Sequence, residues 1–470
     1  MAPPHFLLVA YPSRGSINPT LQLAERLTRA SGRITFFTTV SAHRHMIDPV
    51  RLEGVTFATF SDGYDDGCEL GDDIDHFMAE LKRRGSEALR GLIECSSGRG
   101  LRFTCVLHTM IPWADDVARS LQIQSVLVWI QPATVFGIYY HYFNGFEDVI
   151  KNVTRQSCDT TSLIRLPGLP PLTNRDLPSF FNLENKYAFA LPQMQRQMEQ
   201  QKEGTNPKVV LMNTFDALEL EVLRAVGTLN LVGIGPLVPF QFLDAQDHNS
   251  SDKSLRGDHF RGSEEYVQWL NTKKEASVIY VAFGSLAKFS KAQEREIACG
   301  LLETSRPFLW VMRKSDGDDH ELIHKEELDK RGVIVPWCSQ IEVLSHPSIG
   351  CFFTHCGWNS TLESLACGIP MVAFPQFTDQ MTNSKLVEAV WKVGVRVPEI
   401  NRDDIVVEGG KIKKCLELVM GGGERGDGIR RNAKKWKGLA KEAYKEGGSS
   451  DKNLKAFVEE FTKVQDQKMD

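Results

Sequence analysis

A turn in the second half of the chain has the residue types of a phosphate site. The apolar run 349–354 is followed by the sequence HCGWNS, and a helical pattern begins at Asn359 or Ser360. A helix N-terminus at the end of a strand offers backbone N–H groups and the positive end of the helix dipole, which together attract an anion. His355, Asn359 and Ser360 add side-chain donors, and Gly357 allows a close approach to the backbone. We therefore predict that this turn binds a phosphate group.

Polar side chains on both sides of this turn have the types that bind a nucleoside and a sugar. Glu363, one helical turn further on, can accept hydrogen bonds from ribose hydroxyls. Asp379 and Gln380 follow the next apolar run, and a carboxylate with an amide suits neutral sugar hydroxyls. Upstream, Trp337 can stack on a base, and Gln340 can bind the base or its ribose.

A loop near the start of the chain, PSRGSINP, raises a different question. It follows the apolar run 6–11 and precedes an amphipathic helix, which we expect to begin at Asn18-Pro19 with Asn18 as its N-cap. In an open α/β sheet such a loop faces the ligand crevice, where chemistry is expected. Within it Arg14 stays charged and the Ser16 hydroxyl is too weakly acidic, so no side chain can take a proton at neutral pH.

Alternation of strand and helix patterns places both segments in α/β domains. In the first 240 residues the β-type runs are 6–11, 33–40, 55–60, 104–109 and 125–130. A second series comprises 277–285, 307–313, 332–338, 349–355 and 370–376. Such alternation predicts parallel strands with helical crossovers. We therefore expect two Rossmann-like domains, 1–240 and 241–444, joined by a polar linker near 241–264, with a C-terminal helix, 445–470, packing back onto the first.

Composition narrows the class of partner. The 470 residues carry a net charge of −5, which gives no electrostatic reason to bind nucleic acid or an anionic membrane. No signal peptide is expected, and no run reaches the roughly 18 apolar residues of a transmembrane helix. Ten cysteines without a CxxC pair indicate reduced thiols, so we expect a cytoplasmic protein. We also expect a monomer that acts on small-molecule substrates.

The segment 337–380 resembles the donor-binding box of plant family 1 glycosyltransferases, which use UDP-sugars. It has no gap relative to that box, and the likeness continues along the chain. The sequences FATFSDGYDDG, VWIQPA, DLPSF, MNTFDALE and GSSDKNLKAFVEE resemble the branch with anthocyanin 5-O-glucosyltransferases and crocetin glucosyltransferases. The resemblance implies a GT-B fold, two Rossmann-like domains facing across a cleft, with the acceptor on the first and the UDP-sugar on the second. It also implies inverting transfer of glucose from UDP-glucose to a hydroxyl or carboxyl of a flavonoid, phenolic or carboxylic acid.

The resemblance further implies a role for each matching position. Trp337 and Gln340 would hold the uracil and Glu363 the ribose, with Cys338 counted among the donor-binding residues. The diphosphate would be held from two strand ends, by Ser285, His355, Trp358, Asn359 and Ser360. Asp379 and Gln380 would bind the sugar, and a terminal glutamine usually goes with glucose. No cofactor and no metal ion are implied, and no His, Asp and Glu cluster has the spacing of metal ligands.

The general base of the family is missing from its usual place. There the first loop normally reads like GHINP, and its histidine takes the proton of the acceptor hydroxyl, whereas this chain has Ser16. The aspartate that orients the histidine corresponds to His108 when counted back from Pro112, or to Thr109 if the local alignment shifts by one residue.

Three hypotheses account for Ser16. An engineered substitution could have removed the histidine, or the imidazole could have moved to His108, paired with Ser16. Alternatively no base is needed, because a carboxylic acid acceptor with an unperturbed pKa of about 4 is already ionised at pH 7.

Two other functions compete with glycosyl transfer. A dinucleotide oxidoreductase would share the fold class, but no GxGxxG follows a predicted strand. A UDP-sugar-binding protein with a disabled catalytic site remains the alternative to an enzyme. We expect the segments near 136–146 and 180–190 to line the acceptor pocket. Their sequences do not identify the acceptor.

Overall fold

The structure is a computed structural model, and its parts divide into two compact units. It describes residues 3–30, 32–46, 53–68, 73–155, 162–181, 190–203, 208–239, 265–285, 287–312, 324–398 and 406–467. Unit 1 comprises Met1–Val238 and Glu442–Asp470, and unit 2 comprises Pro239–Lys441. The expected linker, near 241–264, lies outside the described residues.

Unit 1 is built on a seven-stranded sheet in which all neighbouring strands run parallel. The order is β3-β2-β1-β4-β5-β6-β7. The strands are β1 (His5–Val9), β2 (Arg33–Thr39), β3 (Val55–Phe60), β4 (Cys105–His108), β5 (Gln124–Trp129), β6 (Val209–Met212) and β7 (Asn230–Gly233). Most of their residues are buried, as expected for a parallel sheet with helices on both faces.

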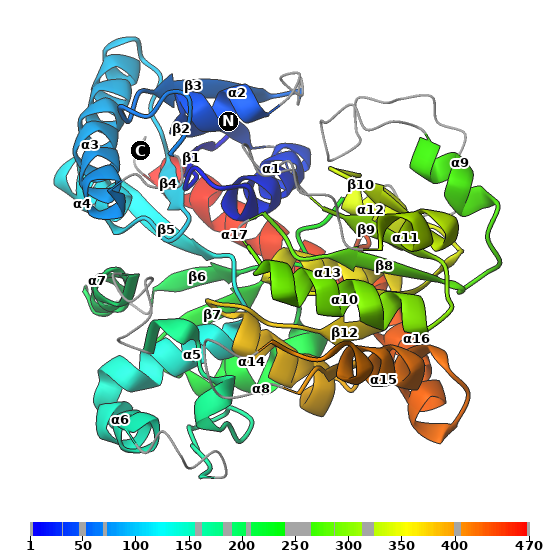
Figure 1. Ribbon diagram of the computed structural model, residues 1–470. Helices are drawn as coiled ribbons and strands as arrows, with labels where there is room; N and C mark the ends of the chain where they lie inside the picture. Colours follow the sequence, from blue (N-terminus) through cyan, green and yellow to red (C-terminus); the bar gives the residue numbers. More distant parts are fainter. Residues whose placement is uncertain are drawn as a thin grey trace. The chain divides into compact units, whose positions relative to one another are not determined.

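Helices cover both faces of this sheet (Figure 1). They are α1 (Arg14–Arg29), α2 (Val40–His45), α3 (Ile74–Gly98), α4 (Pro112–Ser120), α5 (Ala133–His141), α6 (Glu147–Arg155), α7 (Ala190–Lys202), α8 (Asp216–Ala225) and α17 (Ser449–Gln467). Three short helical turns complete the unit: η1 (Tyr142–Phe146), η2 (Asn174–Asp176) and η3 (Ser179–Phe181). Successive β1 side chains alternate between faces, so Phe6 and Leu8 join the core under α1 and α17, whereas Leu7 and Val9 join the core under α3 and α4.

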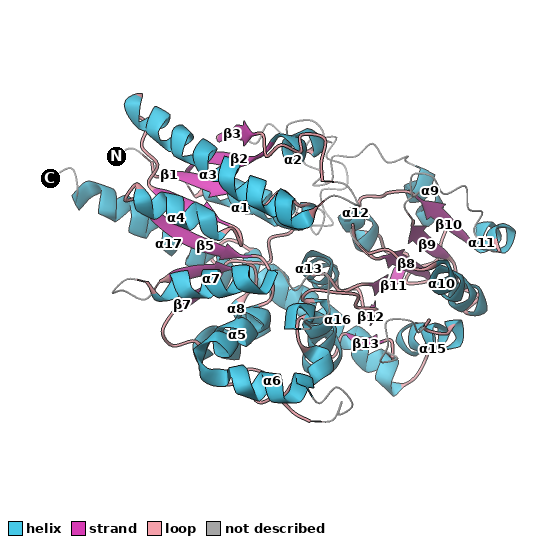
Figure 2. Ribbon diagram, turned by 60° about the vertical axis from the view of Figure 1, so that its left-hand side comes forward, coloured by secondary structure: helices cyan, strands magenta, loops and turns pink. Residues whose placement is uncertain are grey.

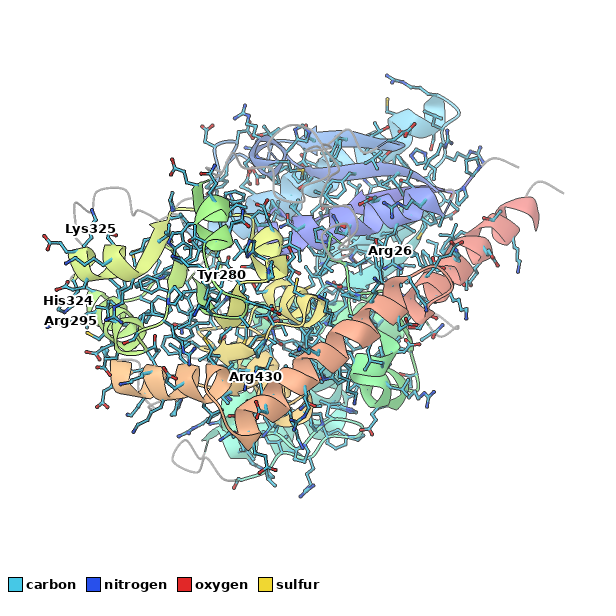
Figure 3. The ribbon with its side chains drawn as sticks, turned by 90° about the vertical axis from the view of Figure 1, so that its right-hand side faces the viewer. Arg26, Tyr280, Arg295, His324, Lys325 and Arg430 are labelled. Carbon is cyan, nitrogen blue, oxygen red and sulfur yellow. The ribbon has the colours of Figure 1, made fainter. Side chains whose placement is uncertain are left out.

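The last helix, α17, is part of the core of unit 1 although it lies at the far end of the sequence. Phe457 and Phe461 bring their rings to within 6.0 and 5.7 Å of the Phe6 ring. Arg26, which lies on α1 and is labelled in Figure 3, lies over the ring of Tyr444 at 5.1 Å and donates to the carbonyl of Ile234. These contacts join the two ends of the chain within one unit.

Unit 2 has a six-stranded parallel sheet of order β10-β9-β8-β11-β12-β13 (Figure 2). The strands are β8 (Val278–Ala282), β9 (Phe308–Val311), β10 (Gly332–Val335), β11 (Ile349–Thr354), β12 (Met371–Ala373) and β13 (Gly394–Arg396). The helices are α9 (Glu265–Asn271), α10 (Lys291–Glu303), α11 (Lys325–Arg331), α12 (Gln340–Ser345), α13 (Trp358–Cys367), α14 (Gln380–Lys385), η6 (Leu386–Val390), α15 (Gly409–Met420) and α16 (Glu424–Tyr444), whose last residues belong to unit 1. α10 and α15 pack their apolar residues onto one face of the sheet.

The structure corrects some of the expected boundaries. α1 begins at Arg14 with Ser13 as its N-cap, so Ser16 lies in its first turn and Pro19 lies inside the helix. Capping preferences alone favour a start at Asn18, but Ile17 belongs to the core of unit 1 and its burial extends the helix. The expected runs did not include β6, β7 or β13, which are only three or four residues long. None of the helices in the described ranges has the length and apolar character needed to cross a bilayer.

Candidate active site

The turn between β11 and α13 (Figure 2) places a helix N-terminus directly after a strand, an arrangement that can bind an anion. Cys356 adopts a φ of 60°, and Gly357 caps α13 with φ −58° and ψ 149°. The helix begins at Trp358, one residue earlier than expected. Its first-turn backbone N–H groups therefore lie at the end of β11. A left-handed conformation is unfavourable for a residue other than glycine, and such strain is common at ligand sites.

His355 is held between two glycines. A Cβ atom at Gly284, which follows β8, would lie 2.5 Å from the His355 Nε2 atom, and one at Gly357 would lie 2.6 Å from it. His355 is only 9% exposed. Burial lowers its pKa to about 4, although a hydrogen bond to the Ala282 backbone favours the charged form. The imidazole is therefore neutral at pH 7, and it can offer an anion a hydrogen bond but no full charge.

A hydrogen-bonded cluster joins α12 to α13. The Gln340 Nε2 atom donates to the Ser360 Oγ at 2.8 Å and to the Glu363 Oε2 at 2.6 Å. The hydroxyl of Tyr280, which lies on β8 and is labelled in Figure 3, donates to the Gln340 Oε1 at 3.4 Å. Cys338 is buried, and its Sγ lies 3.4 Å from the same hydroxyl. The structure thus brings Gln340, Ser360 and Glu363 together, whereas the Cys338 side chain lies in the interior.

The remaining predicted diphosphate and uracil residues differ in exposure. Trp337, after β10, and Asn359, in the first turn of α13, are half-buried, and Ser285, after β8, is exposed. The Trp358 ring is buried and packs against Trp391, with 6.0 Å between ring centroids. The side chain of Trp358 therefore anchors α13, and its contribution to anion binding would come from the backbone.

Gln380 has a fixed amide orientation. Its Oε1 accepts hydrogen bonds from the backbone N–H groups of Gln376, at 2.8 Å, and Phe377, at 3.1 Å. These two donors occupy the carbonyl end of the amide, so the Nε2 group is the end that Gln380 can offer to a ligand.

Asp379 supplies the matching acceptor. It is 6% exposed, its Oδ1 accepts from the Thr378 hydroxyl at 2.8 Å, and its Oδ2 accepts from the Asn383 Nδ2 at 2.7 Å. Burial raises the pKa of this carboxyl, and the two hydrogen bonds act in the opposite direction. Our sequence reasoning missed Asn383 and Thr378. The available signal was an asparagine four residues after the aspartate at the start of a helix, a spacing that places both on one face.

In unit 1, Ser16 is paired with Thr109. The Ser16 Oγ lies 2.8 Å from the Thr109 Oγ1, and that oxygen also accepts from the Tyr11 backbone N–H at 3.0 Å. Ser16 and Thr109 are each 1% exposed. Neither hydroxyl can act as a proton acceptor at neutral pH. The pair occupies the two positions at which a base and its orienting carboxylate were expected.

His108 is not the partner of Ser16, which corrects the pairing considered above. Consecutive strand residues point to opposite faces, so His108 shares a face with Val106, in the core under α3 and α4. Burial lowers the pKa of His108 to about 4, although Asp115 and Asp116 favour its charged form. Among the described atoms its Nδ1 has no hydrogen-bond partner. The His108 imidazole is neutral and only 1% exposed, and these properties do not favour a role as the relocated base.

The segments expected to line the acceptor pocket are described only in part. Phe136 and Tyr139, on α5, are fully buried and contact the Trp129 ring edge-on, at 5.2 and 6.2 Å between centroids. These two side chains belong to a hydrophobic core of unit 1. Residues 182–189 of the second segment lie outside the described residues.

Comparison with known proteins identifies relatives that match nearly the whole chain. The family model described as UDP-glucoronosyl and UDP-glucosyl transferase matches residues 207–407. The chain is 52% identical over 478 residues to a phloretin 4'-O-glucosyltransferase of Malus domestica, covering 98% of each protein. It is also 52% identical over 470 residues to a chloroplastic crocetin glucosyltransferase of Gardenia jasminoides, again covering 98% of each. The crystal structure of Os79 from O. sativa in complex with UDP matches with a TM-score of 0.84 and 31% identity, covering 97% of this chain and 100% of that one.

These similarities confirm two expectations from the sequence. The fold class is confirmed as GT-B, with two Rossmann-like α/β domains. The expected likeness to crocetin glucosyltransferases is confirmed by the second relative. Since the identity extends over nearly the whole length of both relatives, the chain belongs to the plant UDP-dependent glycosyltransferases and is an enzyme of that family.

Proposed function

We propose that this enzyme transfers glucose from UDP-glucose to a carboxyl or hydroxyl of a plant flavonoid, phenolic or carboxylic acid, with inversion at the anomeric carbon. Both relatives described above are named glucosyltransferases, one for a phenol, phloretin, and one for crocetin. We assign the UDP-sugar to unit 2 and the acceptor to unit 1.

The observation that carries this proposal is the arrangement of polar groups on α13. Its N-terminus, with His355 beside it, offers donors to a diphosphate, and Glu363 lies five residues further along the same helix. At a rise of about 1.5 Å per residue, the two groups are about 7.5 Å apart along the axis. A diphosphate followed by a ribose fits this order of groups, and the Asp379 and Gln380 pair then suits the hexose.

The transfer step follows from these groups. An acceptor oxygen attacks the anomeric carbon from the face opposite to UDP, a new C–O bond forms, and the bond to the departing phosphate oxygen breaks. The negative charge that develops on UDP is stabilised by the N-terminal N–H groups of α13 and by the neutral His355 imidazole. Attack opposite to the leaving group inverts the configuration.

The acceptor should arrive already ionised. Ser16 and Thr109 cannot take its proton, and His108 is buried away from them. A carboxylic acid is deprotonated at pH 7, whereas a phenol with a pKa near 10 is about one-thousandth ionised. We therefore propose carboxylic acids and the more acidic phenols as the better acceptors, the hypothesis in which no base is needed.

The test is turnover of an acceptor panel. The enzyme is incubated with UDP-glucose and matched carboxylic, phenolic and flavonoid acceptors, and hexosylated products are detected by mass spectrometry. Ester or glycoside formation with inverted configuration supports the proposal. Product from another UDP-sugar in preference to UDP-glucose would overturn the choice of glucose.

A second candidate function is that of a member of this enzyme family that binds UDP-sugar but has a disabled catalytic site, since the Ser16 and Thr109 pair contains no base. A thermal shift with UDP-glucose does not separate the two, because a ligand stabilises an enzyme and a binder alike. Absence of product with every acceptor, together with measurable affinity for UDP-glucose, would favour the binder.

Metal independence, the monomeric state and the compartment are further parts of this proposal. The nine cysteines within the described ranges are present as thiols, which supports a reducing compartment such as the cytoplasm. Activity that survives chelation of divalent metals would support metal-independent transfer.

A further inference from the structure

Two strained turns border the groups assigned to the UDP-sugar in unit 2. Cys356, at the diphosphate turn, and Thr378, before Asp379, both have a φ of 60°. This left-handed conformation is unfavourable for a residue with a Cβ atom, and for a β-branched residue such as threonine it is rare. Each turn therefore needs contacts that hold it in place.

One side chain, Asn383 on α14, contacts both turns. Its Nδ2 donates to the Cys356 carbonyl at 2.8 Å and to the Asp379 Oδ2 at 2.7 Å. Its backbone N–H also donates to the Asp379 carbonyl at 2.9 Å. Because both side-chain partners are acceptors, the NH₂ end of the amide must face them. The orientation of Asn383 is thus fixed by the two groups that it joins.

The other end of the amide argues for a functional role. Asn383 is 0% exposed, and among the described atoms its Oδ1 is buried without a hydrogen-bond partner. An unsatisfied buried oxygen lowers stability, so a residue selected for stability alone would not leave one. The two donors of Asn383 are kept in spite of this cost.

We propose that Asn383 is a positioning residue that keeps the sugar-binding carboxylate of Asp379 in register with the diphosphate turn at Cys356. The proposal rests on the proposed function, because it assigns the sugar to Asp379 and the diphosphate to this turn. Thr378 donates to one oxygen of the carboxylate and Asn383 to the other, and each oxygen has a further lone pair with which it could accept from a sugar hydroxyl. Asn383 therefore fixes where the sugar hydroxyls must lie relative to the diphosphate.

Loss of Asn383 should affect the sugar more than the nucleotide. The diphosphate turn has a second support, because the Cys356 N–H donates to the Thr354 hydroxyl at 3.2 Å. Without the Asn383 amide, by contrast, Asp379 keeps only the Thr378 hydroxyl as a side-chain donor. For Asn383→Ala we expect Kd for UDP to change by less than about threefold and Kd for UDP-glucose to rise about tenfold, the effect of one hydrogen bond to a charged group.

The experiment compares UDP with UDP-glucose by calorimetry and then compares donors by kinetics. In Asn383→Ala the ratio of kcat/KM for UDP-glucose over UDP-galactose should fall about tenfold, since the register that distinguishes the C4 hydroxyl is lost. The matched control is Asn213→Ala. Asn213 is also 0% exposed, and its Oδ1 accepts from the Leu237 N–H at 2.8 Å in unit 1. This control should lower Tm and leave the donor ratio unchanged.

A second variant keeps the proposal testable if the alanine variant does not fold. Asn383→Asp has nearly the same shape but places a carboxylate against two acceptors. Its activity relative to wild type should rise as the pH falls, because a proton shared with Asp379 restores one donor. An unchanged donor ratio, or equal losses of affinity for UDP and UDP-glucose, would overturn the proposal. The calorimetric comparison needs no acceptor, so absence of turnover in the wild type would contradict the proposed function without deciding the role of Asn383.

Discussion

Installing a base at position 16 tests whether the acceptor must arrive ionised. Ser16 lies in the first turn of α1, with its Oγ 2.8 Å from the Thr109 Oγ1. An imidazole in Ser16→His would find a hydroxyl at this partner position, which can accept its N–H but cannot stabilise an imidazolium. The double variant Ser16→His with Thr109→Asp adds that carboxylate.

The expected gain can be estimated from the worth of a general base. Such a group contributes about 10² to 10⁴ in rate, which corresponds to about 3–5 kcal/mol at about 1.4 kcal/mol per tenfold change. We expect Ser16→His to raise kcat/KM for a phenolic acceptor by about 10², and the double variant by up to about 10⁴. For a carboxylic acceptor the change should stay below about tenfold, because no proton has to be removed.

The assay is the pH dependence of kcat/KM with one phenolic and one carboxylic acceptor. For wild type on the phenol, the rate should increase with pH as the phenol ionises. The His variants should add an inflection near the ordinary histidine pKa of about 6.5. Ser16→Ala is the control, and it should remain within about threefold of wild type, since a hydroxyl that is not a base contributes little.

Two results would refute this reasoning. One is an enzyme-derived inflection in the wild-type profile that disappears in His108→Gln, which would identify His108 as a relocated base. The other is a folded double variant with wild-type Tm and no gain on phenols. Either result would show that the acceptor is not activated in the way proposed here.

The remaining predictions concern unit 2 and the buried histidines. Gln380→Glu keeps an oxygen for the Gln376 and Phe377 N–H groups but loses the Nε2 donor, so kcat/KM for UDP-glucose should fall about tenfold while Kd for UDP stays nearly constant. Gly284→Ala places a Cβ 2.5 Å from the His355 Nε2 at a φ of +75°, so Kd for UDP, measured by calorimetry, should rise about tenfold or more. Burial lowers the pKa of His108 and of His355 to about 4, so protonation favours the unfolded state. The free energy of unfolding should therefore fall as the pH drops from about 6.5 to about 4, by up to about 3 kcal/mol for each histidine, and His108→Gln should remove one such contribution from the Tm profile. Glucosyl transfer should be unaffected by excess EDTA, and a loss of activity restored by added Mg²⁺ would contradict metal-independent transfer.

Contiguous stretches of the sequence were sufficient for the architecture and for the strand, turn and helix that form the proposed anion site. The apolar run before HCGWNS, the helical pattern after it and the alternation along the chain predicted a strand, a turn and a helix in an α/β domain. These features depend on neighbours within a few residues, so local patterns are enough to identify them. The start of α1 was misjudged for the same reason, since capping preferences do not include the burial of Ile17.

Tertiary structure decided which side chains meet. Ser16 and Thr109 are 93 residues apart in sequence, and the parallel pairing of β1 with β4 brings their positions together. The sequence pointed to His108 and left Thr109 as the alternative, because strand alternation selects one of them only when the register is known. The amide orientation of Gln380 and the link from Asn383 to Cys356 likewise depend on backbone groups in a folded loop. A sequence specifies which hydrogen-bonding groups are present, but the packing of distant segments determines which of those groups are satisfied by the protein and which remain for a ligand.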